Sequence, residues 1–479
     1  MPAHEAGALH AEGSHRGPAW LRPPEDVNVL VTPLWARSVR RGAAGALTVG
    51  GLDVRDIARE FGTPAYVIDE DDFRSRAGEF KQAFDEVFQG LCGGVDVYYA
   101  GKAFLCTSVA RWIHEEGLGL DVCSGGELAV AVRAGFPGDR IGFHGNNKSV
   151  AEIETALRYG VGRIVVDSFE EIERVAETAE RLDVVAPVMV RVTVGVEAHT
   201  HEYIATAHED QKFGFSLAGG EAAEAVRRIL GHPAYLSLLG LHSHIGSQIF
   251  DTSGFEVAAR RVLGLHLDVA REHGIALAEL DLGGGFGIAY TTEHDPSSPR
   301  ELALGMAEIL ERECRADGVP VPRISIEPGR AIAGPSTFTL YEVGTVKDVL
   351  LDGDASRTYV AVDGGMSDNI RPALYDADYS CTIAGRVSAA SPALARVVGK
   401  HCESGDIIVK DEFLPSDVRA GDLLAVPGTG AYCRSLSSQY NHMPRPPVVA
   451  VRRGQAREIV RSETIEDLLA LDVDQEERS

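Results

Sequence analysis

The stretch Val95-Asp96-Val97-Tyr98-Tyr99-Ala100-Gly101-Lys102 decides the fold, because it joins a short apolar strand to a polar residue at the strand's carboxyl end. Seven similar apolar runs follow along the chain, and amphipathic helical segments separate them. They begin at residues 118, 141, 163, 187, 238, 280 and 324. Alternating strands and helices favour parallel pairing, and eight such units predict an α/β fold of the (β/α)8 TIM-barrel type. A doubly wound open sheet is the alternative, but the topological switch point that it needs is not evident in the sequence.

The barrel pattern ends near residue 335. Short β-rich runs separated by Gly, Pro and Asp follow it and predict a C-terminal β-sandwich or β-barrel domain. Leu47 to Val54 predicts a small hairpin around a Gly-Gly turn, and this hairpin could join the β-domain. We therefore expect an N-terminal arm over 1–45, a β-domain over 46–63 and 335–470, a barrel over 64–334 and a polar tail over 471–479.

The composition excludes several classes of protein. The chain has 479 residues and a net charge of −25, with 46 Lys and Arg against 71 Asp and Glu. This balance argues against nucleic acid and against an anionic membrane surface as partners. The seven cysteines are scattered and form no C-x-x-C, which argues against a disulfide framework and a cysteine-rich zinc site. No signal peptide and no long apolar run is evident, so we expect a cytoplasmic protein.

Chemically useful residues follow nearly every predicted barrel strand, at the end where such barrels carry their active sites. They are Lys102, Ser124–Glu127, His144–Lys148, His242–Ser247, Gly283–Gly285 and Glu327–Arg330, with Arg191 inside the fifth strand. A glycine triplet can cradle a phosphate, and a lysine can form a Schiff base. A carboxylate can keep a pyridine nitrogen protonated. Together with a flat histidine ring, these groups suggest pyridoxal phosphate as the cofactor.

A metal-dependent hydrolase is a competing interpretation of the same strand ends. His242 and His244 alternate along a strand, so both side chains could point to one face and bind a metal ion. Further His or Asp ligands are not clear at the later strand ends. We therefore expect no metal site.

Six motifs, in this order and spacing, carry a family resemblance. They are Tyr99-Ala100-Gly101-Lys102-Ala103, Leu120-Asp121-Val122-Cys123-Ser124-Gly125-Gly126-Glu127-Leu128, His144-Gly145-Asn146-Asn147-Lys148, His244-Ile245-Gly246-Ser247-Gln248, Glu327-Pro328-Gly329-Arg330 and Cys402-Glu403-Ser404-Gly405-Asp406. From about residue 15 to 470 the chain resembles the fold-type III pyridoxal-phosphate-dependent decarboxylases. Within them it resembles the actinobacterial branch that acts on diaminopimelate. One departure is the segment 435–441, where the familiar Met-Ala-Ser-Asn before the Tyr-Asn pair is missing.

The resemblance implies a role for each matching residue. Lys102 resembles the Schiff-base lysine, Cys402 the proton donor, His244 the residue on the pyridine face and Glu327 the partner of the pyridine nitrogen. The implied cofactor contacts are Lys102, Arg191, His244, Ser247, Gly283, Gly284, Gly285, Glu327, Gly329, Arg330 and Tyr432. The implied substrate contacts are Arg330, Arg371, Tyr375, Glu403 and Tyr432. Because Cys402 and Glu403 enter the site of the other protomer in this family, it also implies a homodimer with shared active sites.

The expected substrate follows from two of these residues. Arg371 suits a distal carboxylate and Glu403 a distal ammonium, and meso-2,6-diaminopimelate has both. The resemblance thus implies its decarboxylation to L-lysine and CO2, the last step of lysine biosynthesis. Three alternatives stay open. They are a decarboxylase of ornithine, arginine or carboxynorspermidine, an amino acid racemase with a second base, and a non-enzymatic pyridoxal-phosphate carrier. A carrier of this kind lacks a β-domain of the size of residues 335–470.

Overall fold

The computed structural model describes residues 17–195, 212–244, 248–252, 255–350 and 356–473. The chain forms two compact units. Unit 1 lies within Met1–Phe73, Ile288–Asp295 and Ala333–Ser479, and unit 2 consists of Arg74–Gly287 and Pro296–Ile332. None of the described helices is both long and apolar enough to cross a membrane.

Unit 2 is a closed barrel of parallel strands. Each strand pairs in parallel with the next around the ring, and the pairing of β8 with β9 closes it. The barrel strands are β5 (Val95–Ala100), β6 (Gly119–Val122), β7 (Ile141–Phe143), β8 (Arg163–Val166), β9 (Ala186–Thr193), β11 (Leu236–Ser243), β12 (Glu279–Asp281) and β13 (Arg323–Ile326). A two-residue strand, β10 (Phe215–Ser216), also pairs with β9. The predicted barrel is confirmed, and the open-sheet alternative is wrong.

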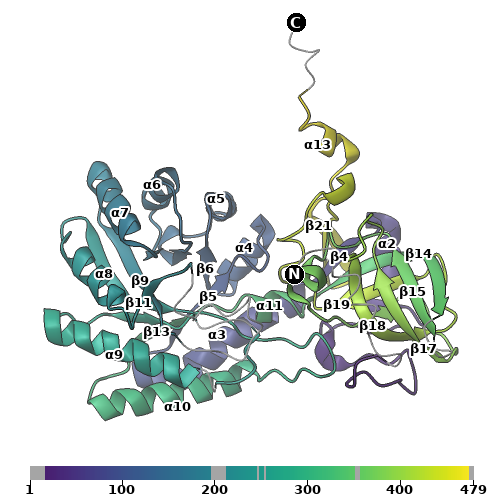
Figure 1. Ribbon diagram of the computed structural model, residues 1–479, viewed down its shortest axis with the longest axis horizontal. Helices are drawn as coiled ribbons and strands as arrows, with labels where there is room; N and C mark the ends of the chain where they lie inside the picture. The colour runs from purple at the N-terminus through teal and green to yellow at the C-terminus, as the bar shows by residue number, and fades with distance from the viewer. Residues whose placement is uncertain (1–16, 196–211, 245–247, 253–254, 351–355, 474–479) are drawn as a thin grey trace, which may run out of the picture. The chain divides into compact units, whose positions relative to one another are not determined.

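Helices alternate with the barrel strands along the chain and surround them (Figure 1). They are α3 (Glu70–Cys92), α4 (Thr107–Glu115), α5 (Gly125–Ala134), α6 (Val150–Tyr159), α7 (Phe169–Leu182), α8 (Glu221–Leu230), α9 (Phe255–His273), α10 (Pro299–Asp317) and the short α11 (Arg330–Ala333); a 3-10 turn, η2 (Gly138–Arg140), precedes β7. Helices α5, α6, α7 and α10 each begin after a serine whose side chain accepts a hydrogen bond from the N–H three residues on. These caps fix where each helix starts.

The barrel interior is closed by a buried ionic network. Arg163, the first residue of β8, donates hydrogen bonds to the hydroxyls of Tyr98 at 2.6 Å and Ser325 at 3.1 Å. Its guanidinium also lies 3.3 Å from Asp281 and 3.1 Å from Glu279. These partners come from β5, β12 and β13, so the arginine side chain spans the inside of the barrel. The interior of the barrel at this level is therefore polar.

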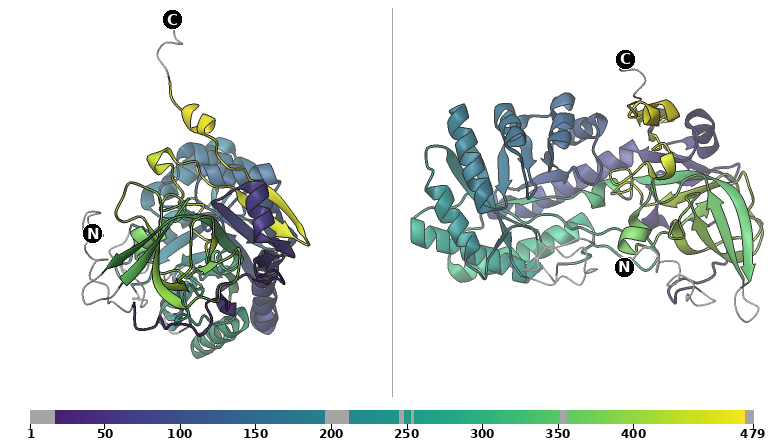
Figure 2. Two further views of the ribbon diagram at one scale, coloured as in Figure 1. Left: turned by 90° about the vertical axis from the view of Figure 1, so that its right-hand side faces the viewer. Right: turned by 45° about the horizontal axis from the view of Figure 1, so that its top comes forward.

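Unit 1 is built around a mixed β-sheet (Figure 2). The main path runs β18-β17-β15-β14-β4-β20-β21, and β19 joins β14 and β16 beside it. The strands are β4 (Ala65–Asp69), β14 (Thr337–Leu350), β15 (Ser356–Val362), β16 (Thr382–Ile383), β17 (Pro392–Val398), β18 (Ile407–Pro415), β19 (Leu423–Pro427), β20 (Val448–Arg452) and β21 (Gln455–Val460). The pairs β15–β17 and β4–β20 are parallel and the other pairs are antiparallel.

One segment lies in a different unit from the one predicted. We expected the barrel to begin at residue 64, but β4 pairs with β14 and with β20 in the sheet of unit 1. The segment Ile288–Asp295 also belongs to unit 1. All five residues of β4 are buried, and its sequence, four apolar residues followed by Asp69, has the same pattern as a barrel strand. The pattern alone does not show which sheet it joins.

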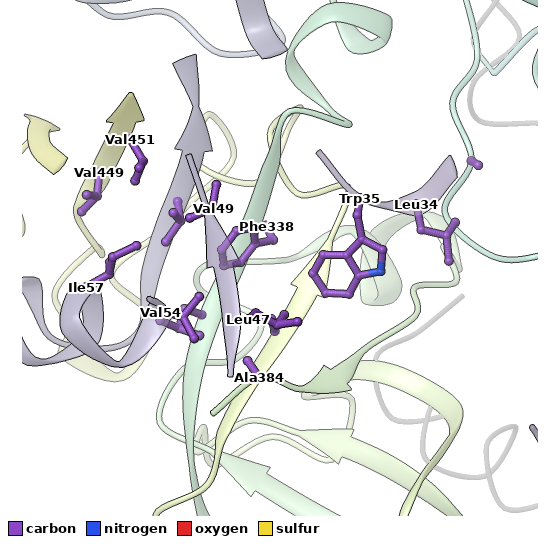
Figure 3. Close-up of a cluster of buried hydrophobic side chains, with 14 residues drawn as sticks. Leu34, Trp35, Leu47, Val49, Val54, Ile57, Phe338, Ala384, Val449 and Val451 are labelled. Atoms are coloured by element: carbon purple, nitrogen blue, oxygen red, sulfur yellow. The ribbon is translucent and has the colours of Figure 1, made fainter. Parts of the chain in front are cut away.

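A hydrophobic cluster holds the N-terminal part of unit 1 to its sheet (Figure 3). Strands β1 (Arg40–Arg41), β2 (Leu47–Val49) and β3 (Leu52–Asp53) form a small antiparallel sheet, which confirms the predicted hairpin and adds a strand to it. Leu34 and Trp35 are buried in the same cluster, and the ring centres of Trp35 and Phe338 are 6.0 Å apart. Part of the predicted irregular arm is therefore packed core.

The remaining elements of unit 1 are short. They are η1 (Thr32–Leu34), α2 (Val54–Phe61), α12 (Arg371–Tyr375), η4 (Tyr440–His442) and α13 (Ile465–Leu469). All seven cysteines are free, as the sequence predicts.

Candidate active site

A cavity of about 140 Å³ opens at the carboxyl ends of the barrel strands. Four residues predicted from the sequence line it together: Lys102, Arg191, His244 and Glu327. The other lining residues are Ala100, Gly101, Asp121, Val122, Cys123, His144, Gly145, Phe213 and His242. The structure thus brings the predicted lysine, arginine, histidine and glutamate into one pocket.

Lys102 stands two residues after the end of β5 and is exposed to the cavity. The preceding residue must be glycine, because a Cβ on Gly101 would lie 2.7 Å from the carbonyl oxygen of Asp121. The N–H of Gly101 donates a 2.9 Å hydrogen bond to that same oxygen. This close approach ties the end of β5 to β6 and places the lysine amine at the mouth of the barrel.

Glu327 follows β13 and is almost fully buried between two histidines. Its Oε1 lies 3.0 Å from Nε2 of His242 and 3.5 Å from Nε2 of His144. Nε2 of His144 also lies 3.2 Å from the carboxylate of Asp121. Burial opposes ionisation, but the neighbouring histidines hold the pKa of Glu327 well below its usual range. Burial and the nearby Glu327 raise the pKa of Asp121 to about 7. Glu327 is therefore the carboxylate that stays charged.

His244 is kept neutral in this pocket. Burial and the nearby Lys102 cation hold its pKa well below the usual value for histidine. Its Nδ1 accepts a 3.1 Å hydrogen bond from the N–H of Gly284. A neutral ring with a fixed orientation can offer a flat face to an aromatic cofactor.

The glycine triplet forms the turn after β12. Gly283 and Gly285 have φ of +69° and +109°, a region that favours glycine. A Cβ on Gly284 would lie 2.3 Å from the carbonyl oxygen of Glu327. The N–H of Gly283 donates to Asp281 at 2.8 Å, and the N–H of Glu327 donates to the carbonyl of Gly283 at 2.9 Å. The triplet is thus packed directly against the strand end that carries Glu327.

Arg191 is mostly buried near the end of β9. Its guanidinium lies 4.4 Å from the ring centre of Phe213, and its Nε lies 3.9 Å from the carboxylate of Asp167. Gly329 and Arg330 follow Glu327, and a Cβ on Gly329 would lie 2.9 Å from Ala100. Ser247 lies outside the described residues.

The other predicted residues belong to unit 1. Arg371 begins α12 and is 3% exposed, and Tyr375 ends the same helix half-buried. Cys402 is exposed, and its N–H donates to the side-chain oxygen of Asn441 at 3.1 Å. The carboxylate of Glu403 accepts from the N–H of Gly405. Tyr432 has a φ of +65°.

The surroundings of Arg371 are unusual for a buried cation. Nη1 donates to the hydroxyl of Tyr379 at 2.5 Å, and the guanidinium lies 4.6 Å from the ring centre of Tyr290 and 5.6 Å from that of Tyr379. Nε has no hydrogen-bond partner among the described residues. The contacts described for the guanidinium of Arg371 are therefore with aromatic side chains and not with a carboxylate.

Comparisons with known proteins place the chain in a family. Residues 70–334 match the family described as "Pyridoxal-dependent decarboxylase, pyridoxal binding domain". The chain belongs to the pyridoxal-dependent decarboxylases. It is 55% identical over 479 residues to a diaminopimelate decarboxylase of Mycobacterium leprae, covering 99% of this chain and 100% of that protein. It is 46% identical to one of Bacillus subtilis, covering 91% and 97%.

Solved structures agree with this placement. A crystal structure of diaminopimelate decarboxylase from M. jannaschii with L-lysine superposes with a TM-score of 0.85 at 31% identity, covering 92% of this chain and 99% of that one. The Helicobacter pylori diaminopimelate decarboxylase with L-lysine gives 0.78 at 30% identity, covering 88% and 99%. The fold is thus that of this decarboxylase family.

The pocket of unit 2 fits pyridoxal phosphate, the cofactor of the family. Oε1 of Glu327 is buried and, although Nε2 of His242 lies 3.0 Å away, forms no hydrogen bond of good geometry with a described residue, so it can accept one from a protonated ring nitrogen. The glycine triplet packs its backbone directly against the strand end that carries Glu327, and glycine-rich turns of this kind are common sites for a phosphate. The amine of Lys102 and the neutral ring of His244 are the two other groups of the pocket that fit this cofactor.

Sequence reasoning missed several pocket residues in this decarboxylase. Asp121 and His144 stand in quoted motifs but received no role, although each lies at the end of a barrel strand, which is a usable signal. Phe213 lies far from any strand-end pattern and gave no signal. A group of potential metal ligands exists among the described residues, but it consists of His144, His242 and Glu327. His244, the second ligand of the hydrolase alternative, is not part of it.

Proposed function

We propose that the chain catalyses the decarboxylation of meso-2,6-diaminopimelate to L-lysine and CO2, the last step of lysine biosynthesis. The observation that carries this proposal is the buried guanidinium of Arg371, whose described partners are aromatic. A buried cation of this kind suits a carboxylate supplied by the substrate, which it can bind bidentately. Ornithine and lysine carry no distal carboxylate. The names of the relatives described above support the same substrate.

The barrel residues hold the cofactor and set its charge. When bound, pyridoxal phosphate accepts the electron pair that remains on the substrate after the carboxyl group leaves. Lys102 supplies the amine that anchors it, and Glu327 keeps a proton at the ring nitrogen. The glycine turn Gly283–Gly285 would lie beside its phosphate, together with Ser247. His244 covers the ring as a neutral group, which leaves the positive charge at the ring nitrogen.

Several further residues complete the cofactor and substrate contacts. Arg191 lies beside the ring, and Gly329 permits the close approach of the strand end to Ala100. Arg330 and Tyr432 contact both cofactor and substrate. Tyr375 assists Arg371 at the distal end of the substrate, where Glu403 accepts a hydrogen bond from the ammonium group. The thiol of Cys402 donates the proton that replaces the lost carboxyl group.

We also propose a cytoplasmic homodimer in which each site uses Cys402 and Glu403 of the partner chain. The exposure of Cys402 supports this, because a proton donor needs a shielded surrounding that a second copy would supply.

The decisive experiment measures CO2 and L-lysine released by the purified, cofactor-loaded protein from meso-2,6-diaminopimelate. We expect both products in equal amounts, with ornithine turned over at least about a hundredfold more slowly, since it leaves Arg371 unpaired in the site. Turnover of ornithine without turnover of diaminopimelate would assign the chain to the related basic amino acid decarboxylases.

The shared site can be tested by complementation. Lys102→Ala and Cys402→Ala are each expected to lose nearly all activity when expressed alone. Co-expression of the two variants should restore about a quarter of the wild-type activity, because a mixed dimer contains one intact site. A site built within a single chain would give no restored activity in the mixture.

A further inference from the structure

Lys148, in the motif after β7, is buried beneath the pocket and has a full set of acceptors. It is 2% exposed. Its Nζ donates to the carbonyl of Gly145 at 2.6 Å, to the carbonyl of Val165 at 2.7 Å and to the carboxylate of Glu171 at 3.2 Å. An ammonium group has three donors, and each is used. The lysine therefore joins the loop after β7, the end of β8 and helix α7.

The contact with Gly145 reaches the pocket directly. Gly145 lines the cavity and has a φ of +108°. A Cβ there would lie 3.1 Å from the carbonyl oxygen of Cys123. The loop is therefore held in a conformation that favours glycine, and the hydrogen bond from Lys148 fixes the direction of its peptide group.

The other partner, Glu171, leads to the opposite wall. Glu171 is 1% exposed, and its carboxylate accepts a 2.8 Å hydrogen bond from the N–H of Asp167. The carboxylate of Asp167 accepts from the N–H of Gly214 at 2.6 Å and lies 3.9 Å from Nε of Arg191. Gly214 follows Phe213, whose ring lies against the same guanidinium. The chain of contacts from Lys148 thus ends at two pocket residues, Phe213 and Arg191.

We propose that the buried Lys148–Glu171 pair is a positioning device that sets two walls of the cofactor pocket at once, Gly145 on one side and Arg191 with Phe213 on the other. Lys148 and Glu171 do not line the pocket themselves. They act through the Gly145 carbonyl and through Asp167.

The energetics of buried ion pairs favour a positioning role. Removing two charges from water is costly, and apolar residues of similar volume often replace such a pair without loss of stability. Stability alone therefore gives little reason for a lysine and a glutamate at these positions. Apolar residues could not donate a hydrogen bond to the loop carbonyl, as Lys148 does, or accept one from a backbone N–H, as Glu171 does.

The test is the double substitution Lys148→Met with Glu171→Leu in the full-length protein. The cofactor-free protein is titrated with pyridoxal 5′-phosphate, and the dissociation constant and the absorbance maximum of the bound cofactor are measured. We expect a dissociation constant about 10- to 100-fold higher, as for residues that orient other ligand-binding groups, and a shifted maximum. The thermal midpoint of the cofactor-free form should remain near that of the wild type.

A control is the pair of the buried Arg357 and the half-buried Asp411 in unit 1, with 3.1 Å between the charged groups. Arg357→Met with Asp411→Leu should leave cofactor affinity and spectrum unchanged. Where the Lys148 double variant fails to fold, Glu171→Gln decides, because its amide keeps the side-chain size but has a single acceptor oxygen, whereas the carboxylate accepts from both Lys148 and the N–H of Asp167. The proposal would be overturned if a folded variant of the Lys148–Glu171 pair bound pyridoxal 5′-phosphate with the affinity and the absorbance spectrum of the wild type. This outcome does not depend on which substrate the enzyme uses.

Discussion

At the residue scale, Tyr379 has a role that the sequence motifs did not indicate. Its hydroxyl accepts a hydrogen bond from Arg371, and its ring and that of Tyr290 lie against the guanidinium. The two rings pack edge to face, with centres 5.1 Å apart. Because an arginine side chain has several rotatable bonds, this aromatic pair restricts where its charge can lie. Tyr379 is therefore a positioning residue for the proposed substrate contact.

Tyr379→Phe should weaken substrate binding without affecting the cofactor. Loss of a hydrogen bond to a charged group costs about 1.5–3 kcal/mol, so we expect KM for diaminopimelate to rise roughly 10- to 100-fold. The absorbance of the bound cofactor should not change. Steady-state kinetics and an absorbance spectrum measure both quantities. Tyr159→Phe is the control, since it removes a hydroxyl that donates only to the carbonyl of Phe136. Equal KM values for the two variants would contradict the role of Tyr379.

At the element scale, the turn after β12 is a part of the barrel that tolerates little change. Gly284→Ala would force a Cβ to within 2.3 Å of the Glu327 carbonyl oxygen, so the turn or the end of β13 must move. We expect weaker cofactor binding, by about tenfold or more, because a small misplacement at an active site has large effects. The dissociation constant of pyridoxal 5′-phosphate is the measurement.

Gly264 provides the comparison for that variant. It lies inside α9, and no atom lies within 4 Å of the position of its Cβ. Gly264→Ala should leave cofactor affinity unchanged and stabilise the helix by about 0.5–1 kcal/mol. A loss of affinity in both variants would show that alanine acts through general destabilisation.

At the scale of the whole molecule, the buried carboxyl group of Asp368 couples stability to pH. Burial raises its pKa to about 7, although Tyr341 and the N–H of Gly365 donate to it. In the unfolded chain an aspartate titrates near 4, so between about pH 4 and 7 the folded protein holds a proton that the unfolded chain has lost. The contribution of Asp368 to the free energy of unfolding therefore falls as the pH rises through this range.

Asp368→Asn removes this titration. The difference in melting temperature, variant minus wild type, should become more positive between about pH 5 and pH 7.5. Scanning calorimetry at the two pH values measures it. The exposed Asp472→Asn should show no such trend. An identical pH dependence for Asp368→Asn and the wild type would be inconsistent with a proton held on Asp368.

The sequence predicted the barrel well because its strands are short apolar runs with a polar residue at one end. Lys102 and Glu327 could be placed in the site for that reason. The same rule could not assign β4, whose residues Ala65–Asp69 are all buried and have the pattern of a barrel strand. It also could not show that Lys148, a polar residue after a strand, lies beneath the pocket instead of lining it. Such assignments depend on contacts between segments far apart in the chain.

The place of β4 in its sheet also determines the order in which the chain can fold during synthesis. β4 lies between β14 and β20, and the barrel segment is translated before either of them. The barrel can therefore complete its fold while β4 still has two unpaired edges. An unpaired apolar strand readily joins other chains, so nascent molecules that stop before Val448–Arg452 should be prone to aggregate.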